Sequence, residues 1–244
     1  MMLPPPFRLQ FFERIDSTND EARRAALAGA PEFTFFVARE QSAGRGRRGN
    51  HWQSLAGNLH CSLLLRPPRS AADAAQLGFA AALAVAEAAE NFLPKGAPIG
   101  LKWPNDVLLG GKKVSGILLE SRAAGDGVDF LVVGIGINLA AHPTDTPYPA
   151  TSLSAWGAEV TPEAALPILA ARFLAWYEAW KRGFASLRAA WLARAAGVGE
   201  PIRVRLPGGE IEGWFGGLDA AGRLVLSGPG GQRTIAAGEV FPAT

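Results

Sequence analysis

The chain has 244 residues, of which 48% are hydrophobic, so it is long enough for one large α/β domain or for a moderate domain with a small appendage. Its 24 basic and 22 acidic side chains balance to a formal charge of +2, which argues against binding nucleic acid or a membrane through a bulk electrostatic field. A single cysteine excludes an internal disulfide, and the most apolar window, Phe79 to Ala89, is interrupted by Glu87 and too short to span a bilayer, so we expect a soluble, cytoplasmic protein.

The N-terminal part of the chain predicts a helix, two strands and a second helix in that order. Thr18 with Glu21 three residues later is typical of a capping box, and the helix that it opens is expected to end near Gly29. β-Branched and aromatic residues predict the strands, and alanine content predicts the second helix, which Pro94 and Gly96 end. The expected ranges are 33–39, 59–65 and 71–93.

The middle of the chain predicts four more strands, which lie over 99–103, 107–109, 114–121 and 128–138. Gly110-Gly111 joins the second and third of these as a hairpin turn. Thr161 and Pro162 open a further helix, whose aromatic spacing carries it to about Arg182, and one more helix is expected over 186–196. These elements predict an α/β (α+β) fold with a mixed, largely antiparallel sheet and flanking helices.

From Pro201 onward the pattern changes to short strands separated by glycine-rich turns at intervals of about ten residues. This pattern is typical of a small β-barrel. We place the boundary near Val198, which divides the chain into a main domain of residues 1–197 and a C-terminal barrel of residues 198–244.

The segment from Gln41 to Trp52, called the arginine loop below, combines three arginines with three glycines between two predicted strands. Arg45, Arg47 and Arg48 offer permanent charge and forked donors that match a carboxylate or a phosphate. The glycines lack the Cβ that keeps backbone away from a ligand. The loop therefore predicts a binding site for an anionic ligand.

The arginine loop also matches the dinucleotide-binding pattern G-x-G-x-x-G through Gly44, Gly46 and Gly49. That fingerprint requires a strand running directly into the first glycine and a helix opening after the last. Here Glu-Gln-Ser-Ala precedes the first glycine and Asn-His-Trp follows the last, so neither requirement is met. The context argues against a Rossmann oxidoreductase. Observed binding of NADH would support that interpretation again.

A second polar stretch, Lys102 to Lys113, lies between predicted apolar strands. Lys112 follows the glycine turn directly and is expected to point to water. Lys113 begins the returning strand, where neighbouring residues alternate faces, so it is a candidate for pairing with an anionic reacting group. A plain hairpin with charged ends is the alternative.

Ser17, Thr18, Asn19 and Asn138 each have a structural and a functional interpretation. The first three suit the cap of a helix. Asn138 follows the glycine-interrupted segment Gly134-Ile-Gly-Ile, either as a turn residue or at a place where backbone approaches a ligand closely.

His60, Cys61 and Trp52 are interpreted mainly as core residues. His60 and Cys61 belong to an apolar strand, and with so few histidines and cysteines no protein metal site is expected. Trp52 is next to the arginine loop, so stacking on a nucleotide base is its alternative role.

Five motifs, taken together and in this order, resemble those of the biotin protein ligases. They are Ser17-Thr-Asn19, Gln41-x-x-Gly-Arg-Gly-Arg-Arg-Gly49 with Trp52, Lys102-Trp-Pro-Asn-Asp106, Lys113-x-x-Gly116-Ile-Leu and Gly134-Ile-Gly-Ile-Asn138. Each motif alone is weak, but their order and spacing are specific. The resemblance extends over nearly the whole chain, because the C-terminal residues resemble that family's small SH3-like barrel.

The resemblance implies an enzyme that works in two steps. Biotin and ATP, with Mg²⁺, would give biotinyl-5'-AMP and pyrophosphate. A specific lysine of the biotin carboxyl carrier protein of acetyl-CoA carboxylase would then receive the biotinyl group. The first step sets a carboxylate against a phosphate, and loop cations with glycine amides offset that repulsion. In this family the arginine loop closes over the adenylate and shields it from water.

The resemblance also assigns roles by position. Biotin binding falls to Ser17, Thr18, Asn19, Gln41, Arg45, Gly46, Arg47 and Lys113. Nucleotide binding falls to Arg45, Arg47, Trp52 and Asn138. The candidates for catalysis are Arg47, Lys113 and Asp106, of which Asp106 would accept the proton of the target lysine.

Two other functions stay open from the sequence. A lipoate protein ligase or octanoyltransferase has a similar fold and an analogous lysine target, whereas a non-enzymatic regulator would bind biotin or a nucleotide and form no pyrophosphate. The glycine-arginine pattern of the loop and the barrel favour biotin. Some family members also carry an N-terminal helix-turn-helix. We expect no room for one ahead of Phe11, hence the monofunctional type with no nucleic-acid partner, as a monomer or a homodimer.

Overall fold

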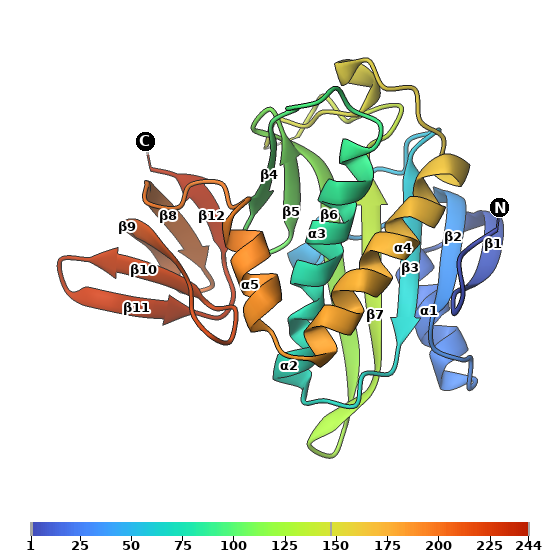
Figure 1. Ribbon diagram of the computed structural model, residues 1–244, viewed down its shortest axis with the longest axis horizontal. Coiled ribbons are helices and arrows are strands. Elements are labelled where there is room, and N and C mark those ends of the chain that lie inside the picture. The colour runs from blue at the N-terminus through green and yellow to red at the C-terminus, as the bar shows by residue number, and fades with distance from the viewer. Residues whose placement is uncertain (1, 147, 244) are drawn as a thin grey trace.

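The computed structural model describes residues 2–146 and 148–243, and these residues form a large sheet and a small sheet. Helices α3 and α4 lie across one face of the large sheet, and the small sheet stands at the far end of the molecule from the N-terminus (Figure 1). The bounds of the helices are α1 (Thr18–Leu27), α2 (Ala71–Ala75), α3 (Leu77–Glu90), α4 (Pro162–Lys181) and α5 (Ala185–Leu192).

The large sheet has seven strands in the order β1-β2-β3-β7-β6-β5-β4. Only β1 and β2 pair in parallel among the described strands, and the other neighbours are antiparallel, which confirms the predicted mixed sheet. The bounds are β1 (Arg8–Ile15), β2 (Thr34–Gln41), β3 (Leu59–Leu65), β4 (Ile99–Lys102), β5 (Asp106–Leu109), β6 (Lys112–Ala124) and β7 (Gly127–Ile137).

The two faces of the large sheet are covered to different extents. One face packs against α3 and α4 in the main hydrophobic core, which buries the alternate β3 residues Leu59, Cys61, Leu63 and Leu65. On the opposite face, α1 packs in a smaller apolar cluster that includes Ala22, Phe36 and Val132. Because α1 begins at Thr18, the part of this face beyond its N-terminus is left without a covering helix.

The start of α1 differs by one residue from the predicted capping box. Ser17 is the N-cap, with an extended backbone and a side chain that accepts from the Asp20 backbone N–H at 3.5 Å. Thr18 is instead the first helical residue, and its side chain is free for contacts across the sheet.

Three further elements were predicted wrongly or not at all. The single helix expected over 71–93 is two helices that meet at Gln76, and the second ends at Glu90. Gln76 accepts a hydrogen bond from the Trp180 indole at 3.0 Å, so its side chain contacts α4 at the point where the two helices meet. Strand β1 was missed because it is an edge strand with little alternation, and the last strand of the barrel was missed because it is very short.

The apolar segment Ala71–Glu90 is long and apolar enough to cross a membrane by length and composition, contrary to the expectation from its shorter window. In the fold, 72% of the 18-residue window within this segment that meets the membrane criterion is buried inside the protein. Burial between the sheet and α4 accounts for its apolar residues.

The small sheet has five antiparallel strands in the order β11-β10-β9-β8-β12. Their bounds are β8 (Pro201–Leu206), β9 (Gly209–Leu218), β10 (Leu224–Gly228), β11 (Gly231–Ile235) and β12 (Glu239–Pro242). This arrangement agrees with the predicted SH3-like barrel.

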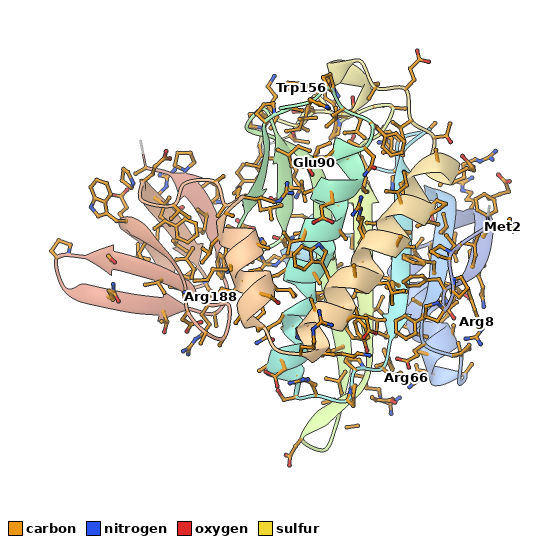
Figure 2. All side chains as sticks on the ribbon, in the orientation of Figure 1. Met2, Arg8, Arg66, Glu90, Trp156 and Arg188 are labelled. Atoms are coloured by element: carbon orange, nitrogen blue, oxygen red, sulfur yellow. The ribbon has the colours of Figure 1, made fainter. Side chains whose placement is uncertain are left out.

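The barrel packs against the helices through a continuous hydrophobic core. The turn at Gly222 lies on Phe79, and its carbonyl accepts a hydrogen bond from the Trp103 indole at 3.3 Å. Arg188 of α5, labelled between the barrel and the helices in Figure 2, donates to the Leu218 carbonyl at 2.8 Å. These contacts fix the barrel relative to the sheet that carries the site.

Gly222→Ala should destabilise the protein more than Gly199→Ala. Both glycines have a φ near +80° that alanine adopts only under strain, but a Cβ at Gly222 would lie 2.8 Å from Phe79, whereas Gly199 has open space. We expect the additional loss in the free energy of unfolding to be about 1–3 kcal/mol, the usual cost of overpacking. Denaturant unfolding of both variants measures this difference. Equal losses of unfolding free energy would show that Phe79 moves aside without cost.

Candidate active site

A cavity of about 630 Å³ opens on the part of the sheet face that α1 leaves uncovered. Its volume is in the range of a small-molecule site. The structure brings all eleven residues that the sequence proposed to its wall. They are Ser17, Thr18, Asn19, Gln41, Arg45, Gly46, Arg47, Trp52, Asp106, Lys113 and Asn138.

One end of the cavity is lined by neutral hydrogen-bonding groups. The Thr18 backbone N–H and hydroxyl both donate to Gln41 Oε1, at 2.8 and 3.1 Å. The Ser62 hydroxyl lies 2.8 Å from Thr18 Oγ1 and 2.5 Å from Asn19 Oδ1. The Asn19 amide N–H also donates to a Glu120 carboxylate oxygen at 2.7 Å, and amide and hydroxyl groups held in fixed positions in this way suit an uncharged polar ligand group.

Two glycines of β7 keep the floor of the cavity free of side chains. Gly134 and Gly136 point to the same face, since they are two residues apart on one strand. A Cβ at Gly134 would overlap the side chain of Asn19, and a Cβ at Gly136 would overlap the indole of Trp52. The sequence suggested that ligand approaches backbone here, but in this structure the space is taken by two of the protein's own side chains.

Trp52 lies half-buried on this glycine floor, with its ring lining the cavity. Its indole N–H donates to His60 Nδ1 at 3.3 Å. Both His60 and Cys61 are buried, as expected for core residues, but His60 reaches the cavity wall through this bond.

Arg45 is already neutralised by a carboxylate of α1. Its two terminal nitrogens donate to the two oxygens of Asp20, at 2.7 and 2.8 Å. The hydrogen bond from Arg45 lowers the pKa of Asp20 against the opposing effect of burial, and the same bond raises the pKa of Arg45. Gly46 is also engaged, because its N–H donates to the Asn50 carbonyl at 2.7 Å. The predicted anion-binding roles of these two residues therefore require a rearrangement.

Arg47 forms hydrogen bonds to neutral groups only. It donates to Asn105 Oδ1 and to the Gly238 carbonyl, both at 3.2 Å, and within the described part of the chain it forms no ion pair. Burial lowers the pKa of Arg47, with the neighbouring Arg48 adding to the shift. A half-desolvated guanidinium with only neutral partners is suited to receive an anion.

The arginine loop also contacts the barrel through Arg48. Its guanidinium lies 3.9 Å from a Glu239 carboxylate oxygen and donates to the Arg205 carbonyl at 3.5 Å. Arg48 has a φ of 55°, a left-handed conformation that is unusual for arginine. Loop and barrel thus close the cavity from the same side.

Asp106 is flanked by two lysines at the cationic end of the cavity. Lys113 lies 2.7 Å from one of its carboxylate oxygens, and Lys102 lies 4.0 Å from the other. Burial lowers the pKa of Lys102, and the Asp106 charge partly opposes that shift. Lys113 thus faces inward as predicted, while Lys112 is exposed.

Asn138 is buried at the end of β7, where its amide N–H donates to the Thr151 carbonyl at 3.0 Å. This bond fits the structural interpretation of the residue as a turn anchor. Within residues 2–146 and 148–243 no group of three histidine, cysteine or acidic side chains is arranged to hold a metal ion.

Three residues of the site were not found from the sequence. Asp20 pairs with Arg45, Ser62 connects Thr18 to Asn19, and Lys102 approaches Asp106. Lys102 and Asp106 belong to the same sequence motif, so the sequence could have suggested that the two side chains lie close together. Asp20 and Ser62 carry no signal of their own, because their partners are distant in the chain.

Comparison with known proteins agrees with this geometry. A model described as the biotin/lipoate A/B protein ligase family matches residues 11–138, and one described as the biotin protein ligase C terminal domain matches residues 197–241. The chain is 48% identical to the biotin--[acetyl-CoA-carboxylase] ligase of Paracoccus denitrificans over 236 residues, which cover 93% of this chain and 98% of that protein.

Two further relatives are similarly informative. The bifunctional ligase/repressor BirA of Bacillus subtilis is 35% identical, with 95% of this chain and 73% of that protein covered. The solved structure of biotin protein ligase from Aquifex aeolicus in complex with biotin and ATP matches with a TM-score of 0.81 at 30% identity, covering 96% of this chain and 97% of that one.

The first model includes lipoate ligases, but the C-terminal match and the 48% identical relative favour the biotin branch, and the relatives are ligases rather than non-enzymatic regulators. Together with a cavity that joins a neutral polar end to a cationic end, these matches show that the chain belongs to the biotin protein ligase family.

Proposed function

We propose that this protein activates biotin with ATP and transfers the biotinyl group to a specific lysine of the biotin carboxyl carrier protein of acetyl-CoA carboxylase. The polarity of the cavity supports this function best. Biotin has an uncharged ureido ring, an aliphatic chain and a carboxylate, and the cavity offers Thr18 and Gln41 at one end, Trp52 in between and Lys113 at the other.

In the first step, a biotin carboxylate oxygen attacks the α-phosphorus of ATP, and the bond to the β-phosphate oxygen breaks to release pyrophosphate. Two anions approach each other in this step, so charge compensation is the main task of the site. Arg47 is the loop arginine best placed for it, because its present partners are neutral and exchangeable. Lys113 supplies a second cation once it turns from Asp106 toward the reacting carboxylate.

In the second step, the amine of the target lysine attacks the acyl carbon, and AMP leaves. The attacking nitrogen loses a proton as the new carbon–nitrogen bond forms. Asp106 is the proposed acceptor, since it is the carboxylate beside Lys113 on the cavity wall.

Further assignments that belong to this proposal concern the metal ion, the domains, the location and the partners. Mg²⁺ enters with ATP, bound by its phosphates. Residues 1–197 form the catalytic domain and residues 198–244 the C-terminal barrel. The protein acts in the cytoplasm as a monomer or a homodimer, and it binds neither nucleic acid nor a membrane.

The purified protein should release pyrophosphate when it is given biotin and MgATP, and it should add the mass of one biotin to a carrier domain. Measurement of both quantities tests the two steps separately. Lipoate and octanoate serve as matched acids, because they also end in a carboxylate but lack the ureido ring. Turnover with these acids and none with biotin would assign the site to the related ligases.

Arg47→Gly should weaken retention of the adenylate, because it removes a positive charge at the cationic end whose hydrogen-bond partners are neutral. We expect free biotinyl-5'-AMP in solution and labelling of bystander proteins, at a rate about tenfold or more above that of the parent protein. Arg48→Gly is the matched control, since it removes the same charge one residue later from a position whose positive φ favours glycine. Similar release by both variants would contradict the role of Arg47.

Gly136→Ala should impair nucleotide binding by displacing Trp52 from the glycine floor. The added methyl group overlaps the indole, and such overpacking costs about 1–3 kcal/mol. We therefore expect the KM for ATP to rise about tenfold. Gly127→Ala on the same strand adds a methyl group 3.6 Å from its nearest neighbour, so its KM should be unchanged. An unchanged KM in both variants would show that the indole position is irrelevant to ATP.

A further inference from the structure

A row of paired residues crosses four neighbouring strands beneath Trp52. His60 of β3 pairs with Gly136 of β7, Gly136 pairs with Gly116 of β6, and Gly116 pairs with Asp106 of β5. The indole lies over the two glycines, where a Cβ at Gly116 would come 3.1 Å from the ring. The row therefore provides a flat recess for an aromatic ring, with a histidine at one end.

Among the described residues, His60 is the one hydrogen-bond partner of the Trp52 indole, while Lys113 Nζ lies over its ring at 5.9 Å from the centroid. An indole N–H is only a donor, and His60 Nδ1 lies 3.3 Å from it. Packing on Gly116 and Gly136 sets the plane of the ring, because the ring lies close to both glycines. The hydrogen bond specifies which edge of Trp52 faces β3 and which edge faces the cavity.

The bond requires a neutral histidine. Nδ1 accepts only when the ring is neutral and its proton is on Nε2. Burial lowers the pKa of His60 to about 4, with the Leu55 backbone opposing the shift, so the ring is neutral near pH 7. Nε2 is buried and has no hydrogen-bond partner among the described residues.

We propose that His60 is a positioning residue for nucleotide binding, which holds the Trp52 indole flat on the Gly116–Gly136 recess before ATP arrives. This inference rests on the proposed function, in which Trp52 faces the adenylate. An aromatic face that is fixed in advance saves the ordering cost that a mobile ring would add to binding. The effect acts through Trp52, so His60 need not touch either substrate.

Two substitutions of nearly equal shape separate the hydrogen bond from packing. Asn places an acceptor oxygen at the position of Nδ1, and Leu has the same branching without an acceptor. His60→Leu should raise the KM for ATP about fivefold, as expected for one lost hydrogen bond, with kcat and the KM for biotin within about twofold. His60→Asn should keep the KM for ATP close to that of the parent protein. A KM for ATP that is unchanged in His60→Leu, or raised equally in both variants, would overturn the inference.

The indole N–H itself gives a second readout that does not depend on activity. The chain has seven tryptophans, so the ¹H–¹⁵N spectrum should contain seven indole signals, and Trp52→Phe identifies the one from Trp52. We expect slow solvent exchange of that proton in the parent protein and in His60→Asn, and fast exchange in His60→Leu. Fast exchange in the parent protein would show that the bond does not persist and would reject the inference.

Trp52→Phe covers the case in which His60→Leu fails to fold. It removes the donor without changing the buried strand, so it should also raise the KM for ATP, and adding His60→Leu to it should cause no further rise. An additive double variant would mean that the two residues act independently. If the parent protein forms no pyrophosphate, the proposed function fails, while slow exchange of the indole proton would still establish the contact.

Discussion

The site depends on the absence of side chains at Gly134 and Gly136. A central strand buried on both faces normally carries bulky residues on each, as β7 does from Phe130 to Val133. At these two positions the sheet face is bare, and Asn19 and Trp52 lie in the space. The two glycines are about 7 Å apart along the strand. Asn19, over Gly134, and Trp52, over Gly136, therefore lie side by side on the same face of the sheet.

The charge of the arginine loop is distributed unevenly for reasons that its sequence does not show. Asp20 neutralises Arg45, and Glu239 of the barrel lies near Arg48, which leaves Arg47 with neutral partners. A substrate anion therefore competes with carbonyl groups at Arg47 and with a carboxylate at Arg45. Since the Gly238 carbonyl is one of the groups displaced, anion binding at Arg47 is coupled to the contact between loop and barrel.

The sequence predicted those features that periodicity and motif order encode. The antiparallel sheet, the hairpin at Gly110-Gly111, the helix opened by Thr161 and eleven of the residues that line the cavity were found in this way. The ion pair of Arg45 with Asp20 and the bond of Trp52 to His60 were not, because each joins segments that only folding brings together. The break at Gln76 was hidden for a similar reason, since alanine propensity continues through it and the Trp180 contact is tertiary.

The position of Trp52 bears on how the site is assembled. A loop rich in glycine loses much conformational entropy when it is ordered, and that cost weakens the binding of any ligand that must order it. Here the middle of the loop is held by the Arg47 and Arg48 contacts to the barrel, and its C-terminal end is held by the indole bond to His60. Much of the ordering cost is thus met by folding, so the remaining movement on binding is the exchange of partners at Arg47, Arg45 and Lys113 rather than the formation of the loop.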